Sequence, residues 1–225
     1  MQILILLKRE FLFFLKSIHI NLLVYFLFPL FTYLFIIMPF SNLFNIIESS
    51  GMNYSYHSIS AIIFACVSIV AFLKPIIIVN RDYESNYLLY IFSSGITPII
   101  YSLYVIIYSM IYAYIQFIIT FLVSLRLSSA GSNLGVLISW EQILYFVIII
   151  FPAILFFSSM GLLFSNFLKK IESILVSVVF LFFVIAFGSC SFIPLDYYPD
   201  TYRNFVYDYN IIFQLYDMFI ELDVK

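Results

Sequence analysis

Residues 58–79 read SISAIIFACVSIVAFLKPIIIV, and Lys74 is the one Asp, Glu, Lys or Arg among them. About 20 apolar residues in a row are enough for a helix to cross the hydrocarbon core of a bilayer. Lys74 lies near one end of the run, where its long aliphatic stem can carry the ammonium towards the membrane surface. The stretch therefore predicts a transmembrane helix.

Four further stretches have the same apolar character and contain no Asp, Glu, Lys or Arg: 18–40, 98–124, 142–167 and 173–194. Helices are favoured over barrel strands because the runs are continuously apolar rather than alternating. Of the 225 residues, 64% are hydrophobic and 10% are charged, whereas a soluble domain has roughly 25% charged residues. The sequence predicts an all-α membrane protein of about five transmembrane helices, with residues 1–225 forming one domain and the spans lying within 18–194.

The N-terminal residues 1–17, MQILILLKREFLFFLKS, have their charges in the middle and no small-residue cleavage site after them, unlike a signal peptide. Gln2, Arg9 and Lys16 recur every seven residues, so a helix would present one polar stripe and a broad apolar face. This pattern predicts an interfacial helix on the cytoplasmic leaflet. The alternative is a cytoplasmic extension of the first span.

The C-terminal residues 195–225 are aromatic, polar and acidic. Asn210, Gln214, Asp217 and Glu221 recur at helical spacing in a run that is otherwise mostly apolar. The run is too short and too charged to cross a membrane. We expect an amphipathic helix over about 201–221 at the extracytoplasmic surface.

Orientation follows from the distribution of Lys and Arg, which are enriched in cytoplasmic loops. With a cytoplasmic N-terminus, seven basic residues lie inside and three outside. The inside set is Lys8, Arg9, Lys16, Lys74, Arg81, Lys169 and Lys170, and the outside set is Arg126, Arg203 and Lys225. The sequence predicts an integral protein of the cell membrane with its N-terminus in the cytoplasm.

The loop between the second and third predicted spans, residues 80–97, reads NRDYESNYLLYIFSSGIT. Asp82 is a candidate helix cap, and Gly95 and Pro98 are suited to end that helix and to start the next span. The apolar positions of the segment follow a helical spacing: Tyr87, Leu88, Ile91 and Phe92. The loop predicts a short cytoplasmic helix that could dock a soluble partner.

Here the sequence resembles the type-2 ABC transporter permeases, the membrane subunits of many ATP-driven exporters. Their interfacial helix and first two spans are followed by a coupling segment of the form acid-Arg-acid-x-Gly-Thr-Leu-Glu-x-Leu-Leu-x-Ser/Thr-Pro. The positions that match the acidic, apolar and small residues are Asp82, Glu84, Leu88, Ile91, Phe92 and Ser94. Gly-Thr is replaced by Asn86-Tyr87, the second Glu by Leu89 and the Pro by Gly95. The resemblance covers residues 1–210, and the sixth span usual in the family has no counterpart before Lys225.

The resemblance implies a membrane-spanning subunit of an ABC exporter that forms its pathway with a second transmembrane subunit, a copy or a related chain. Separate ABC ATPase subunits would bind ATP and Mg, since the sequence has no GxxxxGK[ST] loop, and we expect no catalytic residue, cofactor or metal in this chain. The expected ATPase-coupling residues are Arg81, Asp82, Glu84, Tyr87, Leu88, Ile91 and Phe92. The alternative is an accessory or assembly membrane protein. An intramembrane enzyme is disfavoured because no Asp, Glu or His pair lies within the spans. The net charge of −2 gives no nucleic-acid signature.

The third predicted span carries polar side chains that advance by three or four residues and therefore share one helix face. They are Tyr101, Tyr104, Tyr108, Tyr112 and Gln116. Hydroxyl groups at membrane depth need hydrogen-bond partners. Two interpretations stay open: a translocation pathway at the interface of two subunits, or a helix-packing seam.

Overall fold

The computed structural model describes residues 2–16, 18–40, 54–127 and 140–220, which form helices and, in these ranges, no strand. The elements in chain order are α1 (Gln2–Lys16), α2 (Ile18–Thr32) with the π-helical segment η1 (Tyr33–Ile37), α4 (Tyr54–Glu84), α5 (Tyr87–Ser93), α6 (Pro98–Leu127), α8 (Trp140–Phe164), α9 (Ile171–Phe183) with the π-helical segment η2 (Val184–Gly188), the 3₁₀ turn η3 (Leu195–Tyr197), α10 (Asp200–Tyr209) and α11 (Ile211–Ile220).

Five helices among the described residues are long and apolar enough to cross a membrane: Asn21–Phe40, Ser58–Glu84, Pro98–Ser124, Phe146–Phe164 and Ile171–Gly188. This finding confirms the predicted all-α membrane protein with five spans. The main differences lie at two ends. The second helix runs five residues beyond the predicted 79, and the fifth ends at Gly188 instead of continuing to 194.

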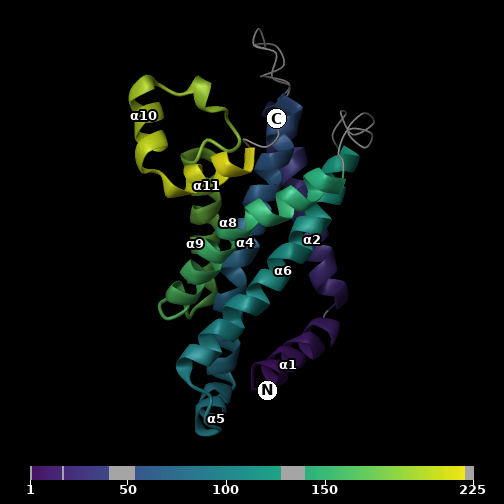
Figure 1. Cartoon of the computed structure of the whole chain (residues 1–225), viewed down its shortest axis with the longest axis vertical. Helices are drawn as coiled ribbons and strands as arrows, with labels where there is room; N and C mark the ends of the chain where they lie inside the picture. Colours follow the sequence, from purple (N-terminus) through teal and green to yellow (C-terminus); the bar gives the residue numbers. More distant parts are fainter. Residues whose placement is uncertain (1, 17, 41–53, 128–139, 221–225) are drawn as a thin grey trace.

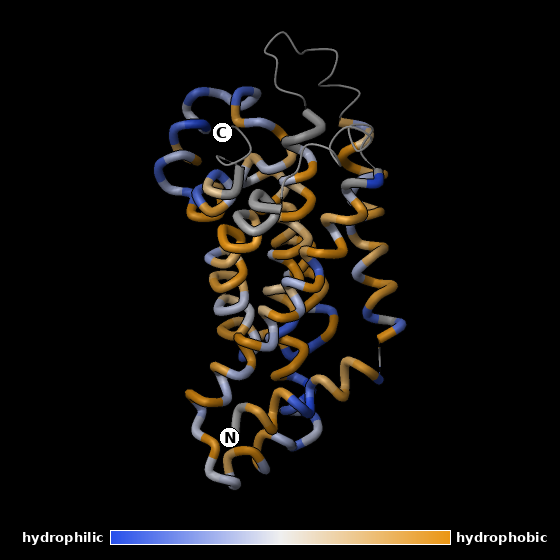
Figure 2. Tube along the Cα trace, turned by 45° about the vertical axis from the view of Figure 1, so that its right-hand side comes forward, coloured by the Kyte–Doolittle hydropathy of each residue, from blue (hydrophilic) through white to orange (hydrophobic). Residues whose placement is uncertain are grey.

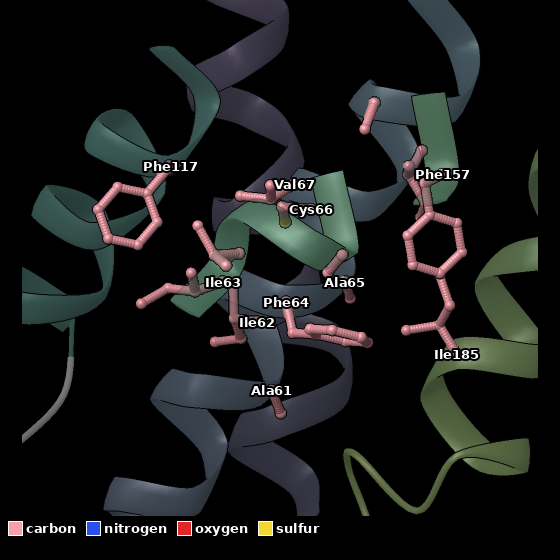
Figure 3. Packing of buried hydrophobic residues seen from close by; sticks show 14 of the residues in the cluster. Ala61, Ile62, Ile63, Phe64, Ala65, Cys66, Val67, Phe117, Phe157 and Ile185 are labelled. Atoms are coloured by element: carbon pink, nitrogen blue, oxygen red, sulfur yellow. The ribbon is translucent and has the colours of Figure 1, made fainter. Parts of the chain in front are cut away.

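The centre of the bundle is α4, which packs against α2, α6, α8, α9 and α11. In its most apolar stretch 83% of the residues are buried, compared with 17–50% in the other four spans. Figure 3 shows Phe117 of α6, Phe157 of α8 and Ile185 of η2 around the segment from Ala61 to Val67. The outer helices expose apolar side chains, and Figure 2 shows hydrophobic residues over the middle of the molecule. This distribution is the one a protein dissolved in lipid requires.

A close approach between α4 and α8 occurs at Gly161. A Cβ atom added to Gly161 would lie 2.1 Å from the main-chain oxygen of Phe72, which is far inside van der Waals contact. Small residues allow helix backbones to approach closely inside membranes. Gly161 therefore fixes how near α8 lies to the central helix.

The molecule has two distinct ends (Figure 1). One end, called the α1 end below, carries α1 and α5, and the other, called the α10 end, carries α10 and α11. The connection between α8 and α9 lies at the α1 end, because Asn80 near the end of α4 donates a hydrogen bond of 2.6 Å to the carbonyl of Leu168. The predicted interfacial and C-terminal segments therefore lie at opposite ends of the bundle.

The C-terminal segment differs from the single predicted helix over 201–221, because it is broken at Asn210 into α10 and α11. The Oδ1 of Asn210 accepts hydrogen bonds from the backbone N–H groups of Ile212 and Phe213, at 3.0 and 3.2 Å. Its Nδ2 donates to the carbonyl of Gly188 at 2.8 Å. An asparagine in this role is a strong helix N-cap, so it starts a new helix and ties that helix to the end of η2.

Candidate functional site

The predicted coupling segment forms a short helix, α5, but it starts later than expected. Asp82 does not cap it, because α4 continues through Glu84 and the N-cap of α5 is Asn86, in the left-handed conformation with φ 55°. The capping prediction is therefore wrong. Gly95, with φ 84°, follows α5, and α6 begins at Pro98, as the sequence predicted.

The expected coupling residues differ in their exposure. Glu84 and Phe92 are exposed, Arg81, Tyr87 and Leu88 are partly buried, and Asp82 and Ile91 are buried. Asp82 and Ile91 therefore have their contacts inside the chain rather than with a soluble partner.

Three side chains of this segment that sequence reasoning did not select are the more exposed ones. Tyr83, Leu89 and Tyr90 expose 61%, 69% and 68% of their surface. On α5, Leu89 lies opposite the buried Ile91 and Tyr90 lies to one side of it, so the helical phase of the loop was the signal that could have identified them. We use the name α5 surface for four exposed residues: Tyr83, Leu89, Tyr90 and Phe92.

A cluster of charged side chains joins α1 to the end of α4. Arg9 donates hydrogen bonds to Glu10 at 2.7 Å and to Asp82 at 2.8 Å. Arg81 pairs with Glu10 and, at 3.3 Å, with Asp82. Only 2% of each carboxylate side chain is exposed. We call these four residues the charge cluster.

The charge cluster also reaches α5 and α6. The hydroxyl of Tyr101 donates to Asp82 at 3.0 Å, and Arg9 donates to the hydroxyl of Tyr104 at 3.0 Å. The Arg9 guanidinium lies 4.4 Å from the centre of the Tyr87 ring, which is a cation–π distance. Burial opposes the charge on Arg9, but the hydrogen bond to Asp82 and the nearby Tyr104 and Glu10 outweigh it, and the pKa of Arg9 is raised above its ordinary value. Arg9 thus links four helices as a permanent cation.

The structure brings the polar side chains of α6 together on one buried face. Their exposed fractions are 5% for Tyr101, 0% for Tyr104, 4% for Tyr108, 6% for Tyr112 and 0% for Gln116. The face packs against Leu6 of α1, Tyr25 of α2 and Val70, Ile78 and Val79 of α4. One interpretation of the sequence placed this face at the boundary between two transmembrane subunits. In the structure, helices of the same chain cover the face instead.

The polar groups of this tyrosine face have partners within the chain. Besides the contacts of Tyr101 and Tyr104 with the charge cluster, Tyr108 and Tyr112 have their hydroxyl oxygens 3.5 Å apart. The Nε2 of Gln116 donates to the carbonyl of Tyr25 at 3.1 Å and to Thr120 at 2.7 Å. The need of buried hydroxyls for partners, which motivated the prediction, is largely met by intramolecular packing.

A groove of about 490 Å³ lies between α2 and α6. Its walls are apolar residues of both helices, with Arg126 as the charged member. Sequence reasoning did not identify it, since it depends on how two helices diverge. Such walls are suited to hydrocarbon, either acyl chains or apolar side chains.

Metal ligands are not grouped in the part of the chain that the structure describes, where no three His, Cys, Asp or Glu side chains are arranged to hold an ion. The expectation that ATP and Mg belong to a separate subunit stays a prediction.

The arrangement is that of a polytopic helical membrane protein. A short helix, α5, lies at one end and contacts the charge cluster through Tyr87. The family model described as ABC-2 type transporter matches residues 1–222, nearly the whole chain. The chain belongs to the ABC-2 type transporter membrane family, the transmembrane component of ABC transporters, and membership implies association with ABC ATPase subunits. Comparisons with curated proteins and with solved structures found no match.

Proposed function

We propose that this chain is the membrane-spanning subunit of an ATP-driven ABC exporter, coupled to separate ATPase subunits that bind ATP and Mg. It forms the translocation pathway with a second transmembrane subunit, which is a copy of this chain or a related one. The α5 surface carries the proposal. It follows the predicted cytoplasmic end of a transmembrane helix and exposes Leu89 and Tyr90 by more than two thirds.

Apolar and aromatic side chains gathered on a surface mark contact sites for other molecules. The neighbouring Glu84 is exposed as well, so the surface combines charge with aromatic rings. Tyrosine is enriched among the residues that dominate binding energy in protein interfaces. An ATPase subunit that receives α5 in a groove fits this chemistry.

Movement of α5 would reach several helices at once. The helix joins α4 to α6, and the buried Ile91 packs in the same apolar cluster as Tyr101 and Tyr104. The charge cluster adds α1 to this unit through the hydrogen bond between Arg9 and Asp82. Closure of the ATPase subunits would therefore displace α1, α4, α5 and α6 together, and we propose that this displacement opens the pathway outward.

Replacement of Leu89 and Tyr90 by Glu tests the docking role. The change removes apolar contacts and adds two charges, while both side chains already point away from the bundle. We expect recovery of the ATPase with the tagged chain to fall about tenfold or more, since loss of one dominant contact costs about 2 kcal/mol or more. The measurement is quantitative mass spectrometry of proteins that co-purify from native membranes.

The matched control replaces Tyr207 and Tyr209 by Glu at the α10 end, where they are 61% and 74% exposed. This variant should recover as much ATPase as the unchanged chain. If the α5 variant recovers as much ATPase as the unchanged chain at equal expression, the proposal that α5 docks the ATPase is contradicted.

A further inference from the structure

Lys74 is a cation within a transmembrane helix, in the second span from Ser58 to Glu84. Its Nζ lies 4.0 Å from the centre of the Tyr112 ring and 5.3 Å from that of Tyr25. Among the described residues no carboxylate lies within ion-pair distance of it. Aromatic faces stabilise an ammonium only in part, and ionisable groups within membranes mark functional sites by default.

The charge balance around Lys74 leaves one positive charge without a counterpart. Glu10 is the carboxylate that interacts electrostatically with Lys74, but it already binds Arg9 and Arg81. Asp82 likewise binds both arginines. Three cations therefore share two carboxylates.

The second aromatic ring near the ammonium carries a buried hydroxyl. The side chain of Tyr25 is 3% exposed, and its hydroxyl has no hydrogen-bond partner among the described residues. Its ring contacts that of Tyr112, with centroids 6.2 Å apart. A buried hydroxyl without a partner is costly. An anionic oxygen near Lys74 would provide both an acceptor for this hydroxyl and the missing negative charge.

We propose that Lys74 and Tyr25 bind the phosphate of an anionic phospholipid, from the leaflet on the side of the α1 end. Phosphate chemistry suits a site that offers an ammonium and an O–H donor. A lipid is the better source than a free anion because Lys74 is only partly buried and the apolar side chain of Ile77, one turn further along α4, is 42% exposed, so this part of the otherwise buried helix is accessible from the bilayer. The site is independent of the docking of an ATPase.

The test compares lipids retained by the purified full-length chain after extraction from nanodiscs that contain phosphatidylglycerol or only phosphatidylcholine. Native mass spectrometry counts them. We expect Lys74→Met to lose phosphatidylglycerol that the unchanged chain retains, and Lys74→Arg to keep it. Lys170→Met removes the same charge from an exposed position and should retain as much lipid as the unchanged chain.

A second arm adds inorganic phosphate to lipid-depleted protein and follows thermal unfolding. We expect no shift of the unfolding temperature with phosphate and an upward shift with phosphatidylglycerol. An upward shift with phosphate alone would contradict the proposal that the ligand is a lipid. Equal lipid retention by Lys74→Met and the unchanged chain would contradict the proposal that Lys74 binds it. If Lys74→Met does not fold, Tyr25→Phe replaces it; this variant keeps the ring and the charge and should retain less lipid, and unchanged retention would again overturn the proposal.

Discussion

At the scale of single residues, Asp82 has a different role from the one its position suggests. It stands where the resemblance implies an acidic coupling residue, yet it accepts hydrogen bonds from Arg9 and Tyr101 and is 2% exposed. A carboxylate in this setting holds neighbouring helices together. Under the proposed function, we expect Asp82 to contribute to coupling mechanically, through α1 and α6, rather than by direct contact with an ATPase.

Replacement of Asp82 by Asn keeps the shape of the side chain and removes its charge. Arg9 and Arg81 then share a single carboxylate. Breaking a buried pair from one side costs about 3 kcal/mol, and we expect the free energy of unfolding to fall by about this amount. The measurement is reversible unfolding in mixed micelles, followed by far-UV circular dichroism.

Glu84→Gln is the matched control, since Glu84 is exposed two residues further along the chain. Its effect should stay within about 0.5 kcal/mol. Equal effects of the two variants would contradict the structural role of Asp82. The loss should not depend on pH near neutrality through Arg9, because the pKa of Arg9 is raised above its ordinary value and the guanidinium stays charged there.

Sequence reasoning found the charges of the charge cluster but not their contacts. The seven-residue spacing of Gln2, Arg9 and Lys16 predicted a helix over 1–17, and the structure confirms a helix at Gln2–Lys16. The partner of Arg9 is 73 positions away, and helical periodicity contains no information about which neighbour a stripe meets. The burial of the charge cluster therefore could not be predicted from the spacing.

At the scale of elements, the packing of α8 on α4 depends on Gly161. Gly161→Ala should lower the free energy of unfolding by about 1–3 kcal/mol, because the new methyl group collides with the main chain of Phe72, which cannot rotate away. The same unfolding measurement applies.

Gly188→Ala is the comparison, since its new Cβ would meet its nearest atom, of Val184, at 3.7 Å, an ordinary contact. Its effect should be small, or stabilising through the higher helix propensity of alanine. A Gly161→Ala variant as stable as Gly188→Ala would contradict the close approach.

The boundaries of elements were predictable where a residue restricts its own backbone. Pro98 starts α6 and Gly95 ends the turn after α5, as local chemistry requires. The division of the C-terminal segment at Asn210 was not predicted. Asn210 stands at helical spacing from Gln214, so it was interpreted as one more residue on the polar face of a single helix. Its further hydrogen bond to the carbonyl of Gly188 joins segments 22 positions apart, a contact that local spacing does not reveal.

At the scale of the whole molecule, orientation is tested by cysteine labelling on intact cells. The basic residues predict the α1 end inside, so a membrane-impermeant maleimide should label Tyr209→Cys and spare Lys170→Cys, both at exposed positions. Background labelling should be low because Cys66 and Cys190 are buried. Burial also raises the pKa of the Cys190 thiol to about 11, so it stays protonated at neutral pH. Labelling of position 170 and not of position 209 would show that the orientation is the opposite of the predicted one.

The central claim is that an ABC ATPase docks on α5, and cross-linking in native membranes tests it most directly. A photoreactive phenylalanine analogue is placed at Tyr90 or, as a control, at Tyr209; these positions are 68% and 74% exposed at opposite ends of the molecule. After irradiation, mass spectrometry identifies the proteins attached at each position. The account predicts an ABC ATPase subunit linked to position 90 and not to position 209. No ATPase at position 90, or equal amounts at both positions, would contradict it.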